Sequence, residues 1–218
     1  MGRVRHNLIH YYALCTVGVL IGSSIALTGL AKNQHSNATV KLTQNSNSTP
    51  VSPITPLPDD ALSTGEQGYL TIDSISSLHF KTTIQTGAQI LHVQNKQTII
   101  QISDRRVKKD GWSLTVKASG LQNAHHEVHS NLIWPTNGQL TTLPGNVSHP
   151  PVQVSPGKLI NRQSNQLLRA NPNTGVGTWV LTLPNDTAPI KLKLPAQQLF
   201  PGKYVGHLTW SLVSAPTN

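Results

Sequence analysis

The sequence predicts one all-β domain over residues 66–218, either a sandwich of antiparallel strands or a barrel-like arrangement of them. Short segments rich in β-branched residues recur through this region, and Gly, Pro, Asn and Asp separate them, as expected of strands and turns. Only 11% of the 218 residues are charged. No stretch carries sustained helical periodicity, so the predicted fold class is all-β.

The first 31 residues have the features of a secretory signal peptide. Arg3 and Arg5 give a basic start, an apolar run follows from Tyr11 to Ala31, and small residues precede a cleavage point after Ala31. About 20 apolar residues can also span a bilayer, so an uncleaved anchor is the alternative. The many Gly, Ser and Thr residues of the run favour cleavage and only transient contact with the membrane. Cys15, the only cysteine, lies in this run, so the mature protein is expected to lack a disulfide.

Residues 32–65 are predicted to form a disordered linker. Asn, Ser, Thr and Pro dominate the segments 45–50 and 53–58, and neither shows apolar periodicity. A flexible coil of this length spans roughly 30 Å. Such a linker would separate the domain from a surface.

The remaining chain is predicted to alternate strands with turns. The expected strands are Gly68–Ile72, Ile75–Phe80, Gln89–Val93, Thr98–Ile102, Trp112–Ala118, Ser130–Trp134, Val152–Val154, Thr178–Leu183, Ile190–Leu194 and Tyr204–Val213. The best helix candidate is Asn161–Ala170. The stretch Leu140–Ser155, which contains three prolines, is predicted to be a long surface loop.

Two of these strands carry the same residues, Trp-Ser-Leu, and predict where the core lies. Alternate side chains of a strand share a face, so Trp112 lies beside Leu114, and Trp210 lies beside Leu212. The opposite faces carry mainly Ser, Thr, Lys and His. A tryptophan on a leucine-bearing face of a half-buried strand is predicted to lie in the core rather than to stack on a sugar.

The other two tryptophans receive opposite predictions. Trp179 shares a face with Leu181 and Leu183, so it is assigned to the core by the same rule. Trp134 directly precedes Pro135 at the end of a predicted strand. It is therefore predicted to be an exposed aromatic residue that could bind a sugar ring by stacking.

Several separate segments together resemble one known family. They are Asp-Arg-Arg at 104–106, Gly-Trp-Ser-Leu-Thr-Val at 111–116, Gly-Val-Gly-Thr-Trp at 175–179, Leu-Lys-Leu-Pro at 192–195, Gly-Lys-Tyr at 202–204, Leu-Thr-Trp-Ser-Leu at 208–212 and Ala-Pro at 215–216. In order and spacing they resemble the WxL family, surface proteins of low-GC Gram-positive bacteria. The resemblance runs from about Glu66 to Pro216. It has one departure, Arg106, at a position where glycine is expected.

The resemblance implies a function at the cell surface. A member of this family would lie outside the cell and attach non-covalently to the wall, with peptidoglycan as its partner, through a C-terminal domain without catalytic activity. The family motif would comprise Trp112, Leu114, Trp179, Trp210 and Leu212. The alternative is a scaffold or adhesin that binds other surface proteins or host matrix. A wall hydrolase is a third and weaker hypothesis.

Charge predicts the kind of partner. The net charge is +9, and without Arg3 and Arg5 the remaining 15 basic and 8 acidic residues leave +7. A basic protein favours polyanionic surroundings. For a secreted chain these would be anionic wall polymers or the carboxylates of peptidoglycan, and nucleic acid is not an expected partner.

A basic loop precedes the first Trp-Ser-Leu segment. It contains four cations within five residues, Arg105, Arg106, Lys108 and Lys109, and Asp104 and Asp110 flank it. Arginine can bind carboxylates and phosphates through two hydrogen bonds at once, which makes this loop a candidate ligand-binding site. The alternative is a solvated turn, as most charge runs are.

Metal binding and catalysis find little support in the sequence. His125, Glu127 and His129 would share one face of a strand, but no second group of metal ligands accompanies them. No Gly-x-Ser-x-Gly segment is present, and the acidic residues are too scattered to suggest a glycosidase pair. We therefore expect neither a metal nor another cofactor, and no enzymatic activity.

Overall fold

The computed structural model of the chain describes residues 48–124, 126–154, 158–196 and 199–214. The predicted signal peptide, with Cys15, and residues 32–47 of the predicted linker lie outside the described residues. The described chain contains antiparallel sheets and no helix. The prediction of an all-β sandwich is thus confirmed. Accordingly, no helix long and apolar enough to cross a membrane occurs in this part of the chain.

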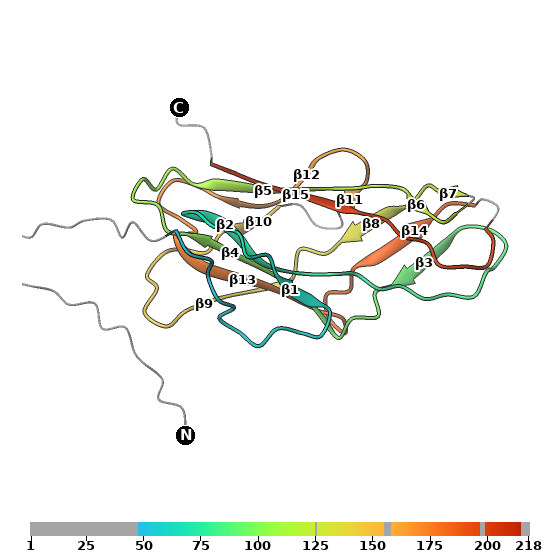
Figure 1. Ribbon diagram of the computed structural model, residues 1–218, viewed down its shortest axis with the longest axis horizontal. Helices are drawn as coiled ribbons and strands as arrows, with labels where there is room; N and C mark the ends of the chain where they lie inside the picture. Colours follow the sequence, from blue (N-terminus) through green and yellow to red (C-terminus); the bar gives the residue numbers. More distant parts are fainter. Residues whose placement is uncertain (1–47, 125, 155–157, 197–198, 215–218) are drawn as a thin grey trace, which may run out of the picture. The chain divides into compact units, whose positions relative to one another are not determined.

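Three sheets build the domain (Figure 1). Sheet I has five strands in the order β1 (Ala61–Ser63), β2 (Leu70–Ser76), β4 (Gln97–Asp104), β13 (Gly177–Pro184) and β9 (Gln139–Thr142). Sheet II has the order β10 (Val152–Gln153), β12 (Asn165–Ala170), β5 (Trp112–Ala118) and β15 (Leu208–Ser214). Sheet III has the order β11 (Lys158–Ile160), β8 (Asn131–Trp134), β14 (Lys191–Leu194) and β3 (Gln89–His92). A short hairpin joins β6 (Leu121–Gln122) to β7 (Glu127–Val128).

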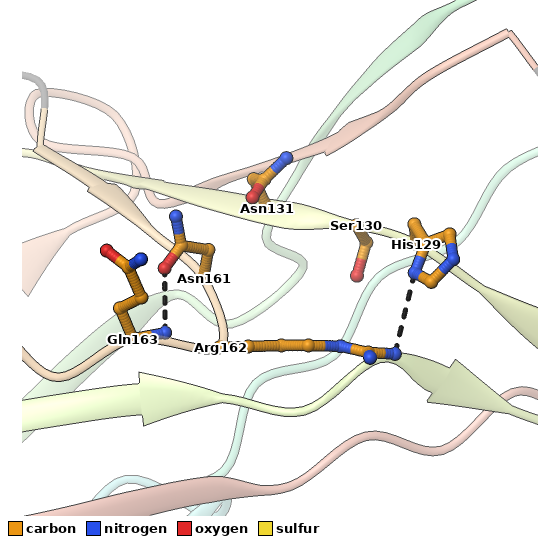
Figure 2. A pocket seen from close by; sticks show the side chains of 6 residues that line it. All are labelled: His129, Ser130, Asn131, Asn161, Arg162 and Gln163. Carbon is orange, nitrogen blue, oxygen red and sulfur yellow. Dashed lines mark hydrogen bonds between the residues drawn. The ribbon is translucent and has the colours of Figure 1, made fainter.

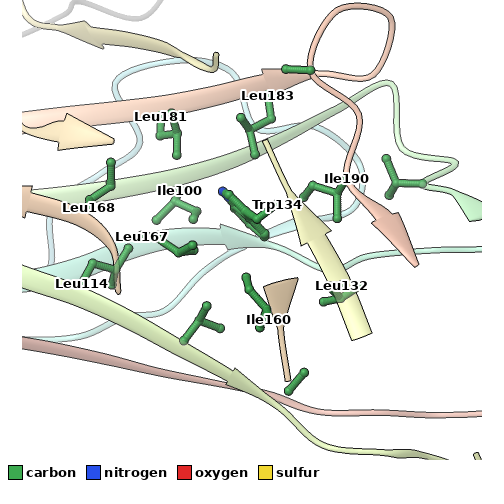
Figure 3. Close-up of a cluster of buried hydrophobic side chains, with 14 of the residues drawn as sticks. Ile100, Leu114, Leu132, Trp134, Ile160, Leu167, Leu168, Leu181, Leu183 and Ile190 are labelled. Atoms are coloured by element: carbon green, nitrogen blue, oxygen red, sulfur yellow. The ribbon is translucent and has the colours of Figure 1, made fainter. Parts of the chain in front are cut away.

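The core lies where the three sheets face one another (Figure 3). Alternate residues of each strand point inward, so β5 contributes Leu114, β4 contributes Ile100 and β8 contributes Leu132. Sheets I and II form the two layers of the sandwich, and the strands of sheet III add Trp134, Ile160 and neighbouring residues to the same apolar cluster. The alternating pattern of the sequence thus becomes one continuous core.

The N-terminal segment of the domain covers the outer face of sheet I. Ile54 and Leu57 pack against Ile99 and Val180, whose side chains point away from the main core. The Gln101 carboxamide holds the backbone of this segment, because its Oε1 accepts from the amide of Ile54 at 2.9 Å and its Nε2 donates to the carbonyl of Ser52 at 3.1 Å. Strand β1 then pairs with β2. The prediction of a disordered linker is therefore wrong for residues 48–65, which belong to the domain.

A buried carboxylate lies on the same face of sheet I. Asp73 is only 2% exposed, and three side chains donate to it: Thr71 at 2.6 Å, Gln101 at 3.0 Å and Ser103 at 2.7 Å. A buried carboxylate is tolerated when hydrogen bonds replace its water shell. Gln101 thus connects the N-terminal segment to this network.

Two predictions for the second half of the domain are wrong. The helix candidate Asn161–Ala170 begins with the turn that follows β11. It continues as strand β12, which pairs with β5. The predicted loop Leu140–Ser155 contains most of β9 and all of β10, which extend sheets I and II at their edges. Both segments gain their regular structure by pairing with distant strands.

Candidate functional site

The first motif tryptophan lies at the centre of the core. Trp112 is fully buried at the start of β5, and its indole Nε1 donates to the carbonyl of Gly175 at 3.1 Å. Trp179 on β13 is 6% exposed, and its Nε1 donates to the carbonyl of Val176 at 3.0 Å. Successive carbonyls of one turn therefore hold both indoles. The core prediction for Trp112, Leu114 and Trp179 agrees with this burial.

The second motif tryptophan lies at the margin of the core. Trp210 is half-buried on β15, an edge strand of sheet II, and its neighbours Leu208 and Leu212 are half-buried as well. Its ring meets Trp134 edge-on, with centroids 5.9 Å apart and planes at 73°. Such T-shaped contacts stabilise beyond the area they bury. The motif strand thus faces the core, as expected, but leaves part of the Trp210 ring accessible.

The prediction of an exposed Trp134 is wrong. Trp134 is 2% exposed because it follows Leu132 on the inward face of β8. Trp134 is the last residue of β8, and it still pairs with Lys158 of the neighbouring strand β11. A proline in the sequence therefore marked the end of a strand, not an opening to solvent.

No tryptophan, tyrosine or phenylalanine among the described residues is fully exposed. All eight tryptophan, tyrosine and phenylalanine residues from 48 to 214 are buried or half-buried, namely Tyr69, Phe80, Trp112, Trp134, Trp179, Phe200, Tyr204 and Trp210. Binding of a glycan strand by stacking on exposed rings finds no support in this part of the chain.

One arginine of the basic loop is bound within the domain itself. The Arg106 side chain, 17% exposed, donates to the buried Asp104 carboxylate through Nε at 2.8 Å and Nη2 at 2.8 Å. It also donates to the carbonyl of Gly111 at 2.8 Å and to Ser214 at 2.5 Å. The hydrogen bond with Asp104 raises the pKa of Arg106, which burial opposes. Arg106 is thus a structural cation that joins the loop to the last residue of β15.

Its neighbour Arg105 binds the other end of the domain. The guanidinium of Arg105 donates to the carbonyl of Gly68 and, at 3.0 Å, to the carbonyl of Thr49. Both arginines are half-buried, so the prediction of four available cations is wrong for these two. Lys108 and Lys109 are exposed, and Lys108 forms a 3.1 Å ion pair with Asp110. Ligand binding by the two lysines stays a prediction.

Gly111, not residue 106, is the glycine that this turn requires. Its φ is +82°, and a Cβ there would lie 2.3 Å from the carbonyl oxygen of Ala170. An L-residue is disfavoured by both the left-handed backbone and the contact. Arg106 is not among the described residues with positive φ, so a side chain is tolerated at that position.

A shallow depression lies elsewhere, at one end of sheet III (Figure 2). It has a volume of about 260 Å³, and three carboxamides, a hydroxyl, an imidazole and a guanidinium line it: Asn131, Asn161, Gln163, Ser130, His129 and Arg162. The residues come from two segments that lie side by side because β8 and β11 pair antiparallel. No sequence motif pointed to this site, since about 30 residues separate the two segments.

An exposed ion pair borders the depression. Arg162 contacts the carboxylate of Glu127, and its Nη2 lies 3.5 Å from His129 Nδ1. Gly120 leaves the space for this pair, because a Cβ there would lie 2.4 Å from Glu127 Oε1. Within the described residues, no group of three or more His, Cys, Asp or Glu side chains could hold a metal ion. His125, the first of the three side chains considered and rejected as metal ligands, lies outside the described residues.

Comparison with known proteins gives one match. A family model described as "WxL domain surface cell wall-binding" matches residues 30–216. No curated protein and no solved structure matches the chain. The matched span contains the whole described domain, together with the motif residues that form its core and the turn that holds them.

Proposed function

Because the chain belongs to the WxL family of surface cell wall-binding domains, we propose that it is a secreted, non-catalytic protein that attaches non-covalently to peptidoglycan. The family match over residues 30–216 carries the proposal. Residues 1–31 would be removed on export, and N-terminal sequencing of wall-bound protein should then begin at Lys32. A sequence that begins at Met1 in the membrane fraction would indicate an anchor instead.

The side chains on the described surface indicate which kind of contact would attach the protein to the wall. The contacts we propose are polar, because every tryptophan, tyrosine and phenylalanine among the described residues is buried or half-buried. The excess of basic residues, +7 without the leader, favours the carboxylates of peptidoglycan or the phosphates of anionic polymers. The motif residues stabilise the domain and do not themselves touch the wall.

Sedimentation with purified walls tests this proposal. The secreted protein is expected to pellet with peptidoglycan from which the anionic polymers have been removed, and to leave the peptidoglycan chemically intact. Binding only to walls that retain these polymers would identify them as the ligand. Failure to bind either preparation would favour the scaffold hypothesis, which the unpaired edge of β15 accommodates because an edge strand can pair with another chain.

The exposed lysines of the basic loop are expected to add a salt-sensitive component. Replacing Lys108 and Lys109 with serine should weaken wall binding a few-fold at 0.1 M salt and have no effect at 1 M, because the Debye length falls from about 10 Å to about 3 Å. The melting temperature should stay within about 2 °C of the parent's, since exposed charges contribute little to folding. Sedimentation at both salt concentrations measures the effect.

A matched control uses two exposed lysines on other loops. Lys81 and Lys96 lie outside the basic loop, so their replacement with serine changes the net charge by the same amount. If both double variants weaken binding equally, the effect comes from net charge and not from the basic loop.

A further inference from the structure

We propose that the depression between residues 129–131 and 161–163 binds the peptide stems of peptidoglycan, in particular an amide group followed by a free carboxylate. The inference deepens the proposed function and rests on it. It assigns the contact to one place on the domain and to one of the chemical components of the wall.

The backbone around the depression is fixed before any ligand binds. The carbonyl of Asn161 accepts from the amide of Ala118 at 2.8 Å, which attaches the turn to β5. The Asn161 carboxamide oxygen accepts from the amide of Gln163 at 2.8 Å, and Asn165 donates to the carbonyl of Gln163 at 2.6 Å. These bonds hold the lining residues of the turn in place, and Figure 2 shows the one between Asn161 and Gln163. A site of this kind does not have to order its backbone on binding.

The lining side chains have unused hydrogen-bonding capacity. Among the described residues, the carboxamides of Asn131 and Gln163 and the hydroxyl of Ser130 have no hydrogen-bond partner. A carboxamide offers a donor and an acceptor together, which matches the N–H and C=O of a peptide bond. A phosphodiester offers acceptors only, so it could use the carboxamide donors but not the carboxamide oxygens. The lining therefore favours amides over the phosphates of anionic polymers.

Cations lie on both sides of the central asparagine. Lys193 on β14 is exposed and pairs directly with Asn131, so the two side chains share the outer face of sheet III. Arg162 lines the opposite side, and its side chain is 58% exposed. Its ion pair with Glu127 is exposed as well and worth little, so an incoming carboxylate can share the guanidinium, which has five donors. A ligand with a carboxylate next to an amide could therefore place the carboxylate at a cation and the amide at Asn131.

The size and surface of the site favour the end of a peptide over the glycan as its main ligand. About 260 Å³ is less than the roughly 300–1,000 Å³ of pockets that enclose a small molecule. The depression suits the end of a chain, and no tryptophan, tyrosine or phenylalanine lines it for a sugar to stack on. Peptide stems end in carboxylates and contain amides, whereas the glycan presents mostly hydroxyls.

Titration of the secreted protein with soluble wall fragments, followed by two-dimensional NMR, tests the site. The probes are a synthetic stem tetrapeptide, the same peptide with an amidated C-terminus, an N-acetylglucosamine tetramer and a glycerol-phosphate oligomer. The tetrapeptide should shift the resonances of residues 129–131 and 161–163. Amidation should weaken it roughly tenfold, as expected for loss of a charged hydrogen bond.

Variants distinguish the site from a general charge effect. Arg162→Gln should bind the tetrapeptide roughly tenfold more weakly and should no longer discriminate against the amidated peptide. Asn131→Ala should weaken both peptides. The matched control is Arg169→Gln, an exposed arginine on β12 that does not line the depression, and it should bind like the parent. Thermal melts should show all three variants folded.

Three outcomes would overturn the site. They are shifts that cluster elsewhere, variants that bind the tetrapeptide like the parent, and binding of the glycan or phosphate oligomer in place of the peptide. In each case the sedimentation assay distinguishes failure of this site from failure of the proposed function. Protein that still pellets with peptidoglycan would leave the proposed function intact and refute only this site, whereas loss of sedimentation with the parent protein would refute the function itself.

Discussion

Replacing Trp112 with alanine is expected to destabilise the domain by about 3–5 kcal/mol, the usual cost of removing a buried tryptophan. Trp112 is fully buried, and its loss also leaves the carbonyl of Gly175 without its indole donor. Since domains of this kind unfold with about 5–15 kcal/mol, a large part of the stability would disappear. At 2–4 °C per kcal/mol, the melting temperature should fall by roughly 6–20 °C.

Trp210→Ala serves as the comparison within the same motif. Because Trp210 is half-buried at the edge of sheet II, its replacement should cost less than that of Trp112. Both variants should lose wall binding only in proportion to unfolding. A Trp112 variant that melts like the parent but no longer sediments with walls would show that the residue contacts the ligand and would contradict its place in the core.

Replacing Arg106 with alanine is expected to cost about 3 kcal/mol. The carboxylate of Asp104, 2% exposed, would remain buried without the cation that now neutralises it, and breaking a buried pair from one side is strongly destabilising. Folding raises the pKa of Arg106. The stabilisation by Arg106 is therefore fully present below its unfolded-state pKa and is lost only as the pH rises through the higher folded-state pKa. The contribution should therefore be constant across neutral and mildly alkaline pH.

Urea denaturation at pH 7 and pH 9 measures this difference. Lys108→Ala is the control, because Lys108 lies in the same loop with a side chain that is 72% exposed, and its loss should change the stability by less than about 0.5 kcal/mol. If Arg106→Ala unfolds like the parent and binds walls less well, the arginine acts as a surface contact and its structural role is refuted.

The alternation of inward and outward side chains along single strands could be predicted from the sequence. The strand at Trp112–Ala118 has the predicted bounds, and the inward faces of β5 and β13 carry the predicted residues. Strand β12 could not be predicted this way because its register shifts between Gln166 and Leu168. The bulge lets adjacent Leu167 and Leu168 both lie buried, and two adjacent apolar residues break the alternation on which strand prediction depends.

Features that depend on distant partners could not be predicted. The proline-rich segment around Ile54 has no periodicity of its own, and its order comes from packing on Ile99 and bonding to Gln101, both more than 40 residues away. The depression likewise exists only because β8 and β11 pair. In the basic loop, the sequence showed four cations but not which of them fold back onto the chain.

The two arginines of the basic loop also bring the two ends of the described domain close together. Arg105 binds Thr49, near the first described residue, and Arg106 binds Ser214, the last residue of β15. Neighbouring residues thus bring the entry and the exit of the folded unit to one loop. A domain with adjacent ends can be inserted into a host protein, or circularly permuted, without pulling its sheets apart.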